Sequence, residues 1–112
     1  MTARINFVEL PARNFGAAKA FYAGVFGWAL TDFGPSYSCT MTGDVDMGLQ
    51  GDTAEATAHP LAVIAVDDLE AALAAVQKAG GTIVKPIFGF PGGRRFHFLD
   101  PNGNELAVLT TD

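Results

Sequence analysis

The amino-acid sequence predicts an α+β protein built from two copies of a strand–helix–three-strand (βαβββ) module. The first observation is an internal repeat, in which the segment from Pro11 overlays the segment from Ala65 and Phe15 falls on Leu69. The second is that both halves share one order of short apolar run, Asn or Asp, helical stretch and glycine. This agreement indicates an internal duplication.

The first half starts with an apolar run over residues 5–10, which is typical of a strand. Asn14 suits a helix N-cap because its side-chain oxygen can accept amide hydrogens of the first turn. A helix of about 12 residues follows, and Gly27 tolerates the left-handed conformation that ends such helices. The helix carries an apolar stripe of Ala18, Phe21, Tyr22 and Val25. Three strands are expected next, over residues 29–33, 37–41 and 45–49.

The second half repeats this order. Residues 61–66 are predicted to form a strand, Asp68 to cap the next helix, and Gly80 to end it. The apolar stripe of that helix consists of Leu69, Ala72, Leu73 and Val76. Strands are then expected over residues 82–88, 95–99 and 105–109, with a turn at residues 100–103.

The chain of 112 residues is assigned to a single domain over residues 1–112. Its first module covers residues 1–52 and its second module residues 60–112. The small and polar stretch over residues 51–60 is the predicted linker between them.

Composition excludes several classes of function. Twelve acidic against seven basic residues give a net charge of −5, which argues against nucleic acid as a partner. The single cysteine, Cys39, cannot form an internal disulfide and favours a reducing compartment. The N-terminus lacks an apolar run of signal-peptide length, and no apolar stretch is long enough to cross a bilayer. We therefore expect a soluble, cytoplasmic protein with no membrane partner.

Three stretches carry a resemblance to a known family. They are residues 21–28 (FYAGVFGW), residues 66–69 with the helix after them, and residues 100–104 (DPNGN). In order and spacing the chain resembles the vicinal oxygen chelate superfamily, which contains glyoxalase I, bleomycin-resistance proteins and extradiol dioxygenases. The resemblance covers nearly the whole chain. It implies two βαβββ modules with curved mixed sheets around a cavity, usually in a homodimer.

The resemblance also implies where a divalent metal ion would bind. Metal-dependent members hold the ion with one residue from the first and one from the last strand of each module, typically His or Glu. The matching positions in this chain are Phe7, Met47, Leu61 and Ala107, and all four are apolar. Such side chains cannot supply the oxygen or imidazole ligands that these ions need. A register slip of one residue would select Asp46 in place of Met47. We predict no metal and no cofactor.

Alternation along the strands predicts a ligand-binding face around these positions. Glu9 shares a face with Phe7, and Glu105 shares one with Ala107. The result is an apolar cavity with two carboxylates near its rim, as in many small-molecule sites. The predicted ligand-binding residues are Phe7, Glu9, Met47, Leu61, Val63, Arg95, Glu105 and Ala107.

Glu9 and His97 are the candidates for proton transfer, and each has a second interpretation. Glu9 is either a base or ligand anchor in the cavity, or a strand-end residue paired with a surface cation such as Arg4. His97 shares a face with Arg95, and the sequence does not decide where this face lies. It either meets the cavity, where the two side chains could bind an anionic ligand, or faces solvent or the partner subunit. Glu105 follows a tight turn, which favours a solvated or structural role.

Two aromatic features are equally open. The glycine-rich stretch over residues 88–94 is either a lid over a ligand or an ordinary hairpin connection. Trp28 and Tyr37 either stack on a flat ligand or belong to the core or a subunit interface.

These observations favour a binding protein for a small organic molecule, aromatic or cationic, that lacks the family's metal ligands. The alternative is a metal-independent enzyme of the lyase or isomerase type that uses Glu9 or His97 for proton transfer. A metal-dependent glyoxalase or dioxygenase conflicts with the ligand positions. We also expect a homodimer, from the resemblance and because open sheets leave edges and apolar faces that a partner would cover.

Overall fold

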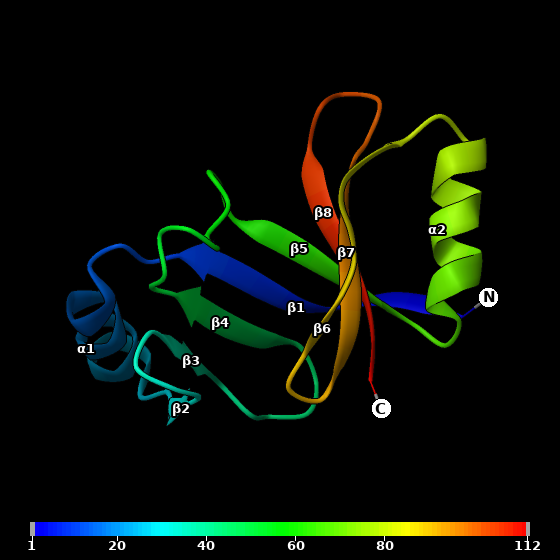
Figure 1. Ribbon diagram of the computed structural model, residues 1–112. Coiled ribbons are helices and arrows are strands. Elements are labelled where there is room, and N and C mark those ends of the chain that lie inside the picture. The colour runs from blue at the N-terminus through cyan, green and yellow to red at the C-terminus, as the bar shows by residue number, and fades with distance from the viewer. Residues whose placement is uncertain (1, 112) are drawn as a thin grey trace. The chain divides into compact units, whose positions relative to one another are not determined.

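The computed structural model describes residues 2–111 and has the predicted order of elements (Figure 1). The first module comprises β1 (Ala3–Pro11), α1 (Phe15–Phe26), β2 (Thr31–Asp32), β3 (Tyr37–Cys39) and β4 (Asp46–Gln50). The second module comprises β5 (Leu61–Val66), α2 (Leu69–Lys78), β6 (Thr82–Phe90), β7 (Gly93–Leu99) and β8 (Glu105–Thr111). The α+β fold of two βαβββ modules is therefore confirmed.

The chain forms two compact units. The N-terminal unit is Phe7–Leu61, and the C-terminal unit combines Ala62 onward with the residues up to Asn6. The first residues of β1 thus belong to the C-terminal unit. Each unit is described separately below.

In the N-terminal unit the strand order is β2-β3-β4-β1. β4 runs parallel to β1, with Val8 opposite Met47 and Glu9 opposite Gly48, and the other pairs are antiparallel. The helix α1 packs on one face of these strands. The core on this face consists of Ala12, Met47 and Leu49, lined by Leu10, Phe15, Ala18, Tyr22 and Leu30.

The helix α1 lies mostly outside this core. No residue of α1 is fully buried, and Phe21, Val25 and Phe26 each expose more than half of their surface. Only part of the predicted apolar stripe therefore meets the sheet. Asn14 occupies the N-cap, but its side chain makes no capping hydrogen bond, in contrast to the prediction. Gly27 ends the helix in the left-handed region, at φ 69°, as predicted.

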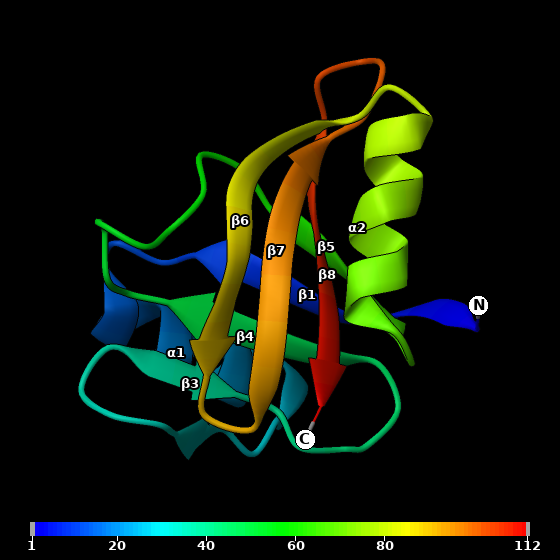
Figure 2. The same ribbon diagram turned by 45° about the vertical axis from the view of Figure 1, so that its right-hand side comes forward.

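In the C-terminal unit the strand order is β5-β8-β7-β6, and α2 covers one face of the sheet (Figure 2). The core on this face consists of Val66, Leu69, Ala72, Phe96 and Val108. Asp68 caps α2 as predicted, because its Oδ1 accepts a hydrogen bond of 3.0 Å from the amide of Ala71. Arg94 reaches the same helix, with its Nη1 2.6 Å from Oε2 of Glu70.

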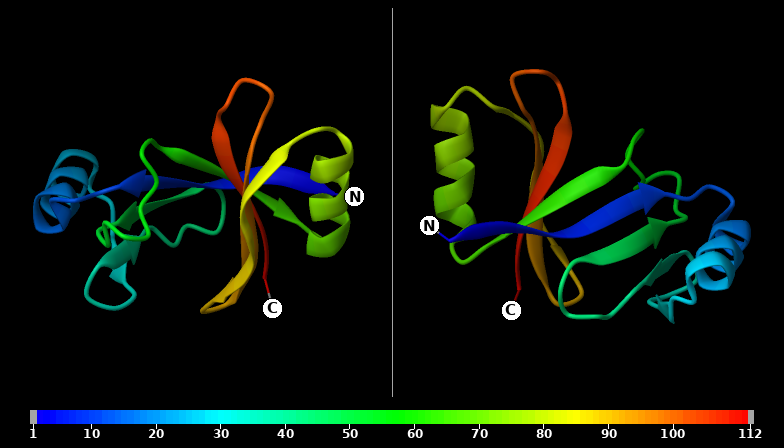
Figure 3. Two further views of the ribbon diagram at one scale, coloured as in Figure 1. Left: turned by 45° about the horizontal axis from the view of Figure 1, so that its top comes forward. Right: turned by 180° about the vertical axis from the view of Figure 1, so that it is seen from behind.

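The β6–β7 hairpin is longer than predicted (Figure 3). β6 extends to Phe90 and β7 begins at Gly93, so that only Pro91 and Gly92 remain in the turn. Gly92 has φ 101°, a conformation that favours glycine. The stretch over residues 88–94 is thus a hairpin connection in this structure. Among the helices described, neither has the length and apolar character needed to span a bilayer.

Candidate functional site

The face of the C-terminal unit that lies away from α2 carries its polar candidates. Phe96 and Phe98 pack with the α2 core, so the alternating residues Arg95 and His97 lie on the opposite face. Across the strands His97 lies opposite Ala107, which in turn lies opposite Val63. The structure therefore brings four predicted site residues and His97 to one face: Val63, Arg95, Glu105 and Ala107 lie there with it.

His97 is the central residue of this face. Its side chain is completely inaccessible to solvent, so it does not face water as one interpretation held. Its Nδ1 lies 2.7 Å from Oε2 of Glu105. Its Nε2 is buried and has no hydrogen-bond partner among residues 2–111. A buried polar atom without a partner is uncommon in folded proteins and often marks a functional position.

The surroundings keep the imidazole neutral. Desolvation by burial lowers the pKa of His97 below its ordinary value, and the positive charges of Arg95 and Lys85 lower it further. The hydrogen bond to Glu105 acts in the opposite direction but does not cancel these effects. As a carboxylate Glu105 has only acceptor atoms, so the shared hydrogen belongs to Nδ1 of His97. Nε2 is then a hydrogen-bond acceptor.

An aromatic ring and two cations border His97. The ring of Phe88 is 5.8 Å from the imidazole, centroid to centroid. The guanidinium group of Arg95 lies over the same ring at 5.3 Å, and the ammonium group of Lys85 at 5.9 Å. Lys85 also lies directly opposite His97 in the β6–β7 pairing. Of this cluster, sequence reasoning missed Lys85, because the bulges on both sides of it in β6 determine which residue lies opposite His97. Phe88 was considered only as part of a possible lid over residues 88–94 and not as a neighbour of His97.

Glu9 lies in the N-terminal unit and is also buried, with 2% of its surface exposed. The hydroxyl group of Tyr37 donates a hydrogen bond of 3.0 Å to its Oε1. This burial contradicts the interpretation of Glu9 as a residue on the surface. Tyr37 was expected either to stack on a ligand or to pack in the core or a subunit interface. In the structure its hydroxyl group instead donates a hydrogen bond to Glu9.

Gly48 makes room for this pair. A Cβ atom at position 48 would meet the Tyr37 hydroxyl group and would lie 2.7 Å from the ring of Phe7. A glycine inside a strand often marks such a close approach. This signal was present in the sequence, but the prediction did not use it.

Met47 does not lie on the predicted face. It pairs with Val8 and packs in the α1 core with Leu49, on the opposite side of the sheet from Glu9. The predicted register was wrong by one residue, and because side chains alternate this moved Met47 to the other face. The β4 residue that lies opposite Phe7 in the β1–β4 pairing is Asp46.

The carboxylate of Asp46 accepts hydrogen bonds from the loop that precedes β4. Thr40 and Thr42 donate hydrogen bonds of 2.7–2.8 Å to its Oδ1, and the amide of Gly43 donates one of 3.0 Å to Oδ2. Desolvation alone would raise the pKa of Asp46, but these hydrogen bonds lower it to about 2. The carboxylate therefore serves to hold the loop before β4.

The residues at the family's metal positions do not fit a divalent ion. Leu61 and Ala107 are fully buried apolar residues, and Met47 faces the α1 core. Phe7 presents an aromatic ring beside Gly48. Within residues 2–111 no three His, Cys, Asp or Glu side chains gather in a way that would hold a metal ion. These positions lack the oxygen and nitrogen ligands that such an ion requires.

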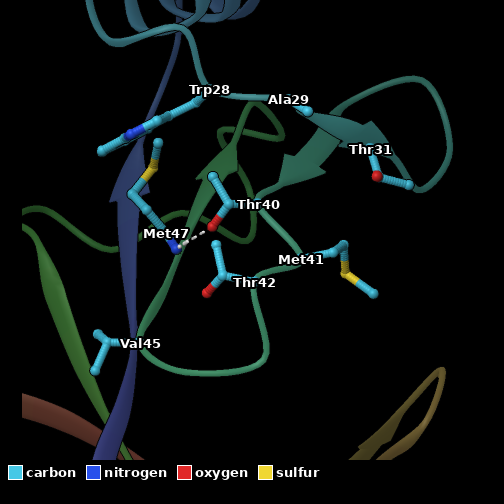
Figure 4. A pocket seen from close by; sticks show the side chains of 8 residues that line it. All are labelled: Trp28, Ala29, Thr31, Thr40, Met41, Thr42, Val45 and Met47. Carbon is cyan, nitrogen blue, oxygen red and sulfur yellow. Dashed lines mark hydrogen bonds between the residues drawn. The ribbon is translucent and has the colours of Figure 1, made fainter.

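The N-terminal unit also has a hollow of about 300 Å³ beside Trp28 and Met47 (Figure 4). Its lining consists of Trp28, Ala29, Thr31, Thr40, Met41, Thr42, Val45 and Met47. The hydroxyl groups of Thr40 and Thr42 already donate to Asp46. The hollow thus offers an apolar surface with its central polar groups engaged, which makes it a weaker candidate than the His97 face.

Comparison with known proteins places this fold in a family. The family model "Glyoxalase/Bleomycin resistance protein/Dioxygenase superfamily" matches residues 4–108. A putative glyoxylase, CFP32 of Mycobacterium bovis, is 32% identical over 92% of this chain, and the anthracycline biosynthesis protein DnrV of Streptomyces peucetius is 29% identical over 94%. The chain spans 44% and 40% of these two proteins.

A solved structure agrees with this placement at the level of the fold. The Mn(II)-bound glyoxalase from Novosphingobium aromaticivorans superposes with a TM-score of 0.70 and 22% identity, over 97% of this chain and 40% of that chain. The family match over nearly the whole chain shows that this protein belongs to the glyoxalase/bleomycin resistance protein/dioxygenase superfamily.

Proposed function

We propose that this protein binds a small organic molecule with an aromatic part at the His97 face of the C-terminal unit, and that it does so without a metal ion. The observation that carries the proposal is the buried His97, whose Nδ1 is paired with Glu105 while Nε2 has no partner in the part of the chain that the structure describes. A few polar groups set in an apolar surface are the usual chemistry of small-molecule sites. Phe88 supplies an aromatic surface beside these groups.

The relatives support the class of ligand without identifying one. One is named as a putative glyoxylase and another as an anthracycline biosynthesis protein, and both names concern small organic molecules. The apolar residues at Phe7, Leu61 and Ala107 support a site without metal.

A thermal-shift screen tests the proposal. The panel should hold neutral, cationic and anionic aromatic compounds, each measured on the wild type and on a His97→Leu variant. We expect at least one class to raise the midpoint of the wild type and not of the variant. Elemental analysis after incubation with Zn, Ni, Fe and Mn should find no stoichiometric ion. A panel without any stabilising compound, or retention of one ion per chain, would overturn the proposal.

A second candidate is a metal-independent enzyme of the lyase or isomerase type. It is favoured by the Glu105–His97 pair, since a carboxylate that fixes an imidazole leaves Nε2 ready to accept a proton. The test is exchange of α-hydrogens of carbonyl compounds for deuterium in D₂O, followed by NMR. His97→Gln should abolish the exchange. Glu9→Gln should leave it unchanged, and loss in that variant instead would assign the base to Glu9.

We also propose that the chain forms a homodimer through an apolar surface at the C-terminal end of α1 and the residues just after it. This surface consists of Phe21, Val25, Phe26 and Trp28, all exposed, with the rings of Phe26 and Trp28 5.2 Å apart. An exposed apolar patch of this kind often marks an interaction site. Sedimentation velocity should show a dimer for the wild type and a monomer for Phe26→Asp. A monomeric wild type at micromolar concentration contradicts the proposal.

A further inference from the structure

The geometry around His97 narrows the class of ligand, and this step rests on the proposed function. We propose that the site selects an aromatic compound with an acidic hydroxyl group, a phenol, whose O–H donates a hydrogen bond to Nε2 of His97. The ligand's ring would then lie beside Phe88.

The direction of the hydrogen bond at His97 determines what a ligand must bring. Glu105 takes the hydrogen on Nδ1 at 2.7 Å, so the neutral ring offers only an acceptor at Nε2. Within the described residues no donor reaches this atom. A ligand that satisfies it must therefore bring a donor, and a ligand with only acceptors would leave it unsatisfied.

The charges beside His97 favour one kind of donor. Arg95 lies over the Phe88 ring at 5.3 Å, and Lys85 lies opposite His97 in the pairing with β7. When a hydroxyl group donates, its oxygen gains negative charge, and nearby cations favour this change. These cations therefore stabilise the hydrogen bond of an acidic hydroxyl group more than that of an aliphatic one. The Phe88 ring, 5.8 Å from the imidazole, favours an aromatic carrier for that hydroxyl group.

Access to the buried nitrogen depends on strand β6. β6 is the last strand in the order β5-β8-β7-β6, and its pairing with β7 is irregular on both sides of Lys85, between Ile83 and Phe88. Pro86 lies within this stretch and has no amide hydrogen to donate. A segment with fewer regular ladder bonds opens at lower cost. Displacement of Phe88 from His97 therefore costs less than it would in a regularly paired strand, although its neighbour Ile87 packs against the α2 core.

The experiment compares phenol with anisole, which has the same ring but no hydroxyl donor. NMR titrations of the full chain, ¹⁵N-labelled at histidine, give both affinities and the tautomer of His97. We expect phenol to bind about tenfold more tightly than anisole, as one hydrogen bond gives. We also expect the free protein to show the Nδ1–H tautomer.

Two variants separate the hydrogen bond from general effects. In Glu105→Gln the amide can donate to Nδ1 as well as accept from it, so the tautomer is no longer fixed. The preference for phenol should fall below about threefold. His59 is exposed and lies far from His97 in the sequence. The variant His59→Gln should therefore keep the wild-type preference for phenol, and it serves as the spectral control.

The outcomes distinguish this inference from the proposed function. Equal affinities for phenol and anisole at the His97 face would overturn the phenol inference and leave binding at that face intact. A wild-type Nε2–H tautomer would overturn it as well. If phenol fails while another aromatic compound binds, the inference is wrong and the proposed function stands. If no aromatic compound binds, both fail.

Discussion

The hydroxyl group of Tyr37 lies 3.0 Å from Oε1 of Glu9 and donates a hydrogen bond to a carboxyl group that is almost completely buried. Tyr37→Phe removes this donor and keeps the ring. We expect a loss of about 1–3 kcal/mol in the free energy of unfolding, because a buried acceptor loses its hydrogen bond. Chemical denaturation checks the value.

Tyr22→Phe is the matched control for this prediction. Tyr22 stacks on Trp28 with ring centroids 5.8 Å apart, and the ring is retained in the variant. Its unfolding free energy should change by less than about 0.5 kcal/mol. Equal losses in both variants would show that the Tyr37 hydroxyl group has no special role.

The lowered pKa of His97 predicts a pH dependence of stability. In the unfolded chain His97 binds a proton with the ordinary pKa of histidine, 6.5. In the folded chain it binds this proton only at a lower pH, because its pKa is lowered. Stability from this residue is therefore complete above pH 6.5 and is lost as the pH falls from there toward the folded-state pKa. The slope approaches about 1.4 kcal/mol per pH unit for one proton.

Denaturation curves between pH 8 and 5, at one salt concentration, should show this slope for the wild type and for His59→Gln. The slope should be reduced in His97→Gln. A wild type whose stability stays constant across this range would argue against a neutral, desolvated His97.

The two helix starts give a direct comparison of capping. Asp68 accepts a hydrogen bond from the amide of Ala71, whereas Asn14 makes no capping bond with its side chain. Asp68→Ala should cost about 0.5–2 kcal/mol of unfolding free energy. Asn14→Ala should cost less than about 0.5 kcal/mol. Thermal denaturation of both variants measures the difference, and an equal cost would contradict the assigned caps.

Gly48→Ala should destabilise the N-terminal unit by about 1–3 kcal/mol, because the added methyl group meets the Tyr37 hydroxyl group and the ring of Phe7. Gly24→Ala in α1 is the control, since no atom lies within 4 Å of its added Cβ. That variant should gain up to about 1 kcal/mol through helix propensity. Urea denaturation of both variants measures these changes. A Gly48→Ala variant with the unfolding free energy of the wild type would contradict the close approach.

The sequence predicted much of the fold because local signals agreed with the tertiary structure. Asp68 caps α2 and Gly27 ends α1, and each follows from the chemistry of one residue. The two-residue strand β2 was predicted too long, since its bounds depend on its pairing with β3 and not on its own apolar residues.

The site was harder to predict, because it depends on register and on faces. A shift of one residue on β4 placed Asp46, and not Met47, opposite Phe7. The direction of His97 was left open, and only the packing of Phe96 against α2 determines it. Periodicity shows that two faces exist but does not say which one a helix will cover.

Gly48 has a consequence for how this chain can change over generations. A larger side chain at this position meets Tyr37 and Phe7, so a substitution there costs less stability once one of those two has become smaller. We therefore expect positions 7, 37 and 48 to vary together among descendants of this sequence. Introduction of a carboxylate at position 48 would carry the same cost in a single step.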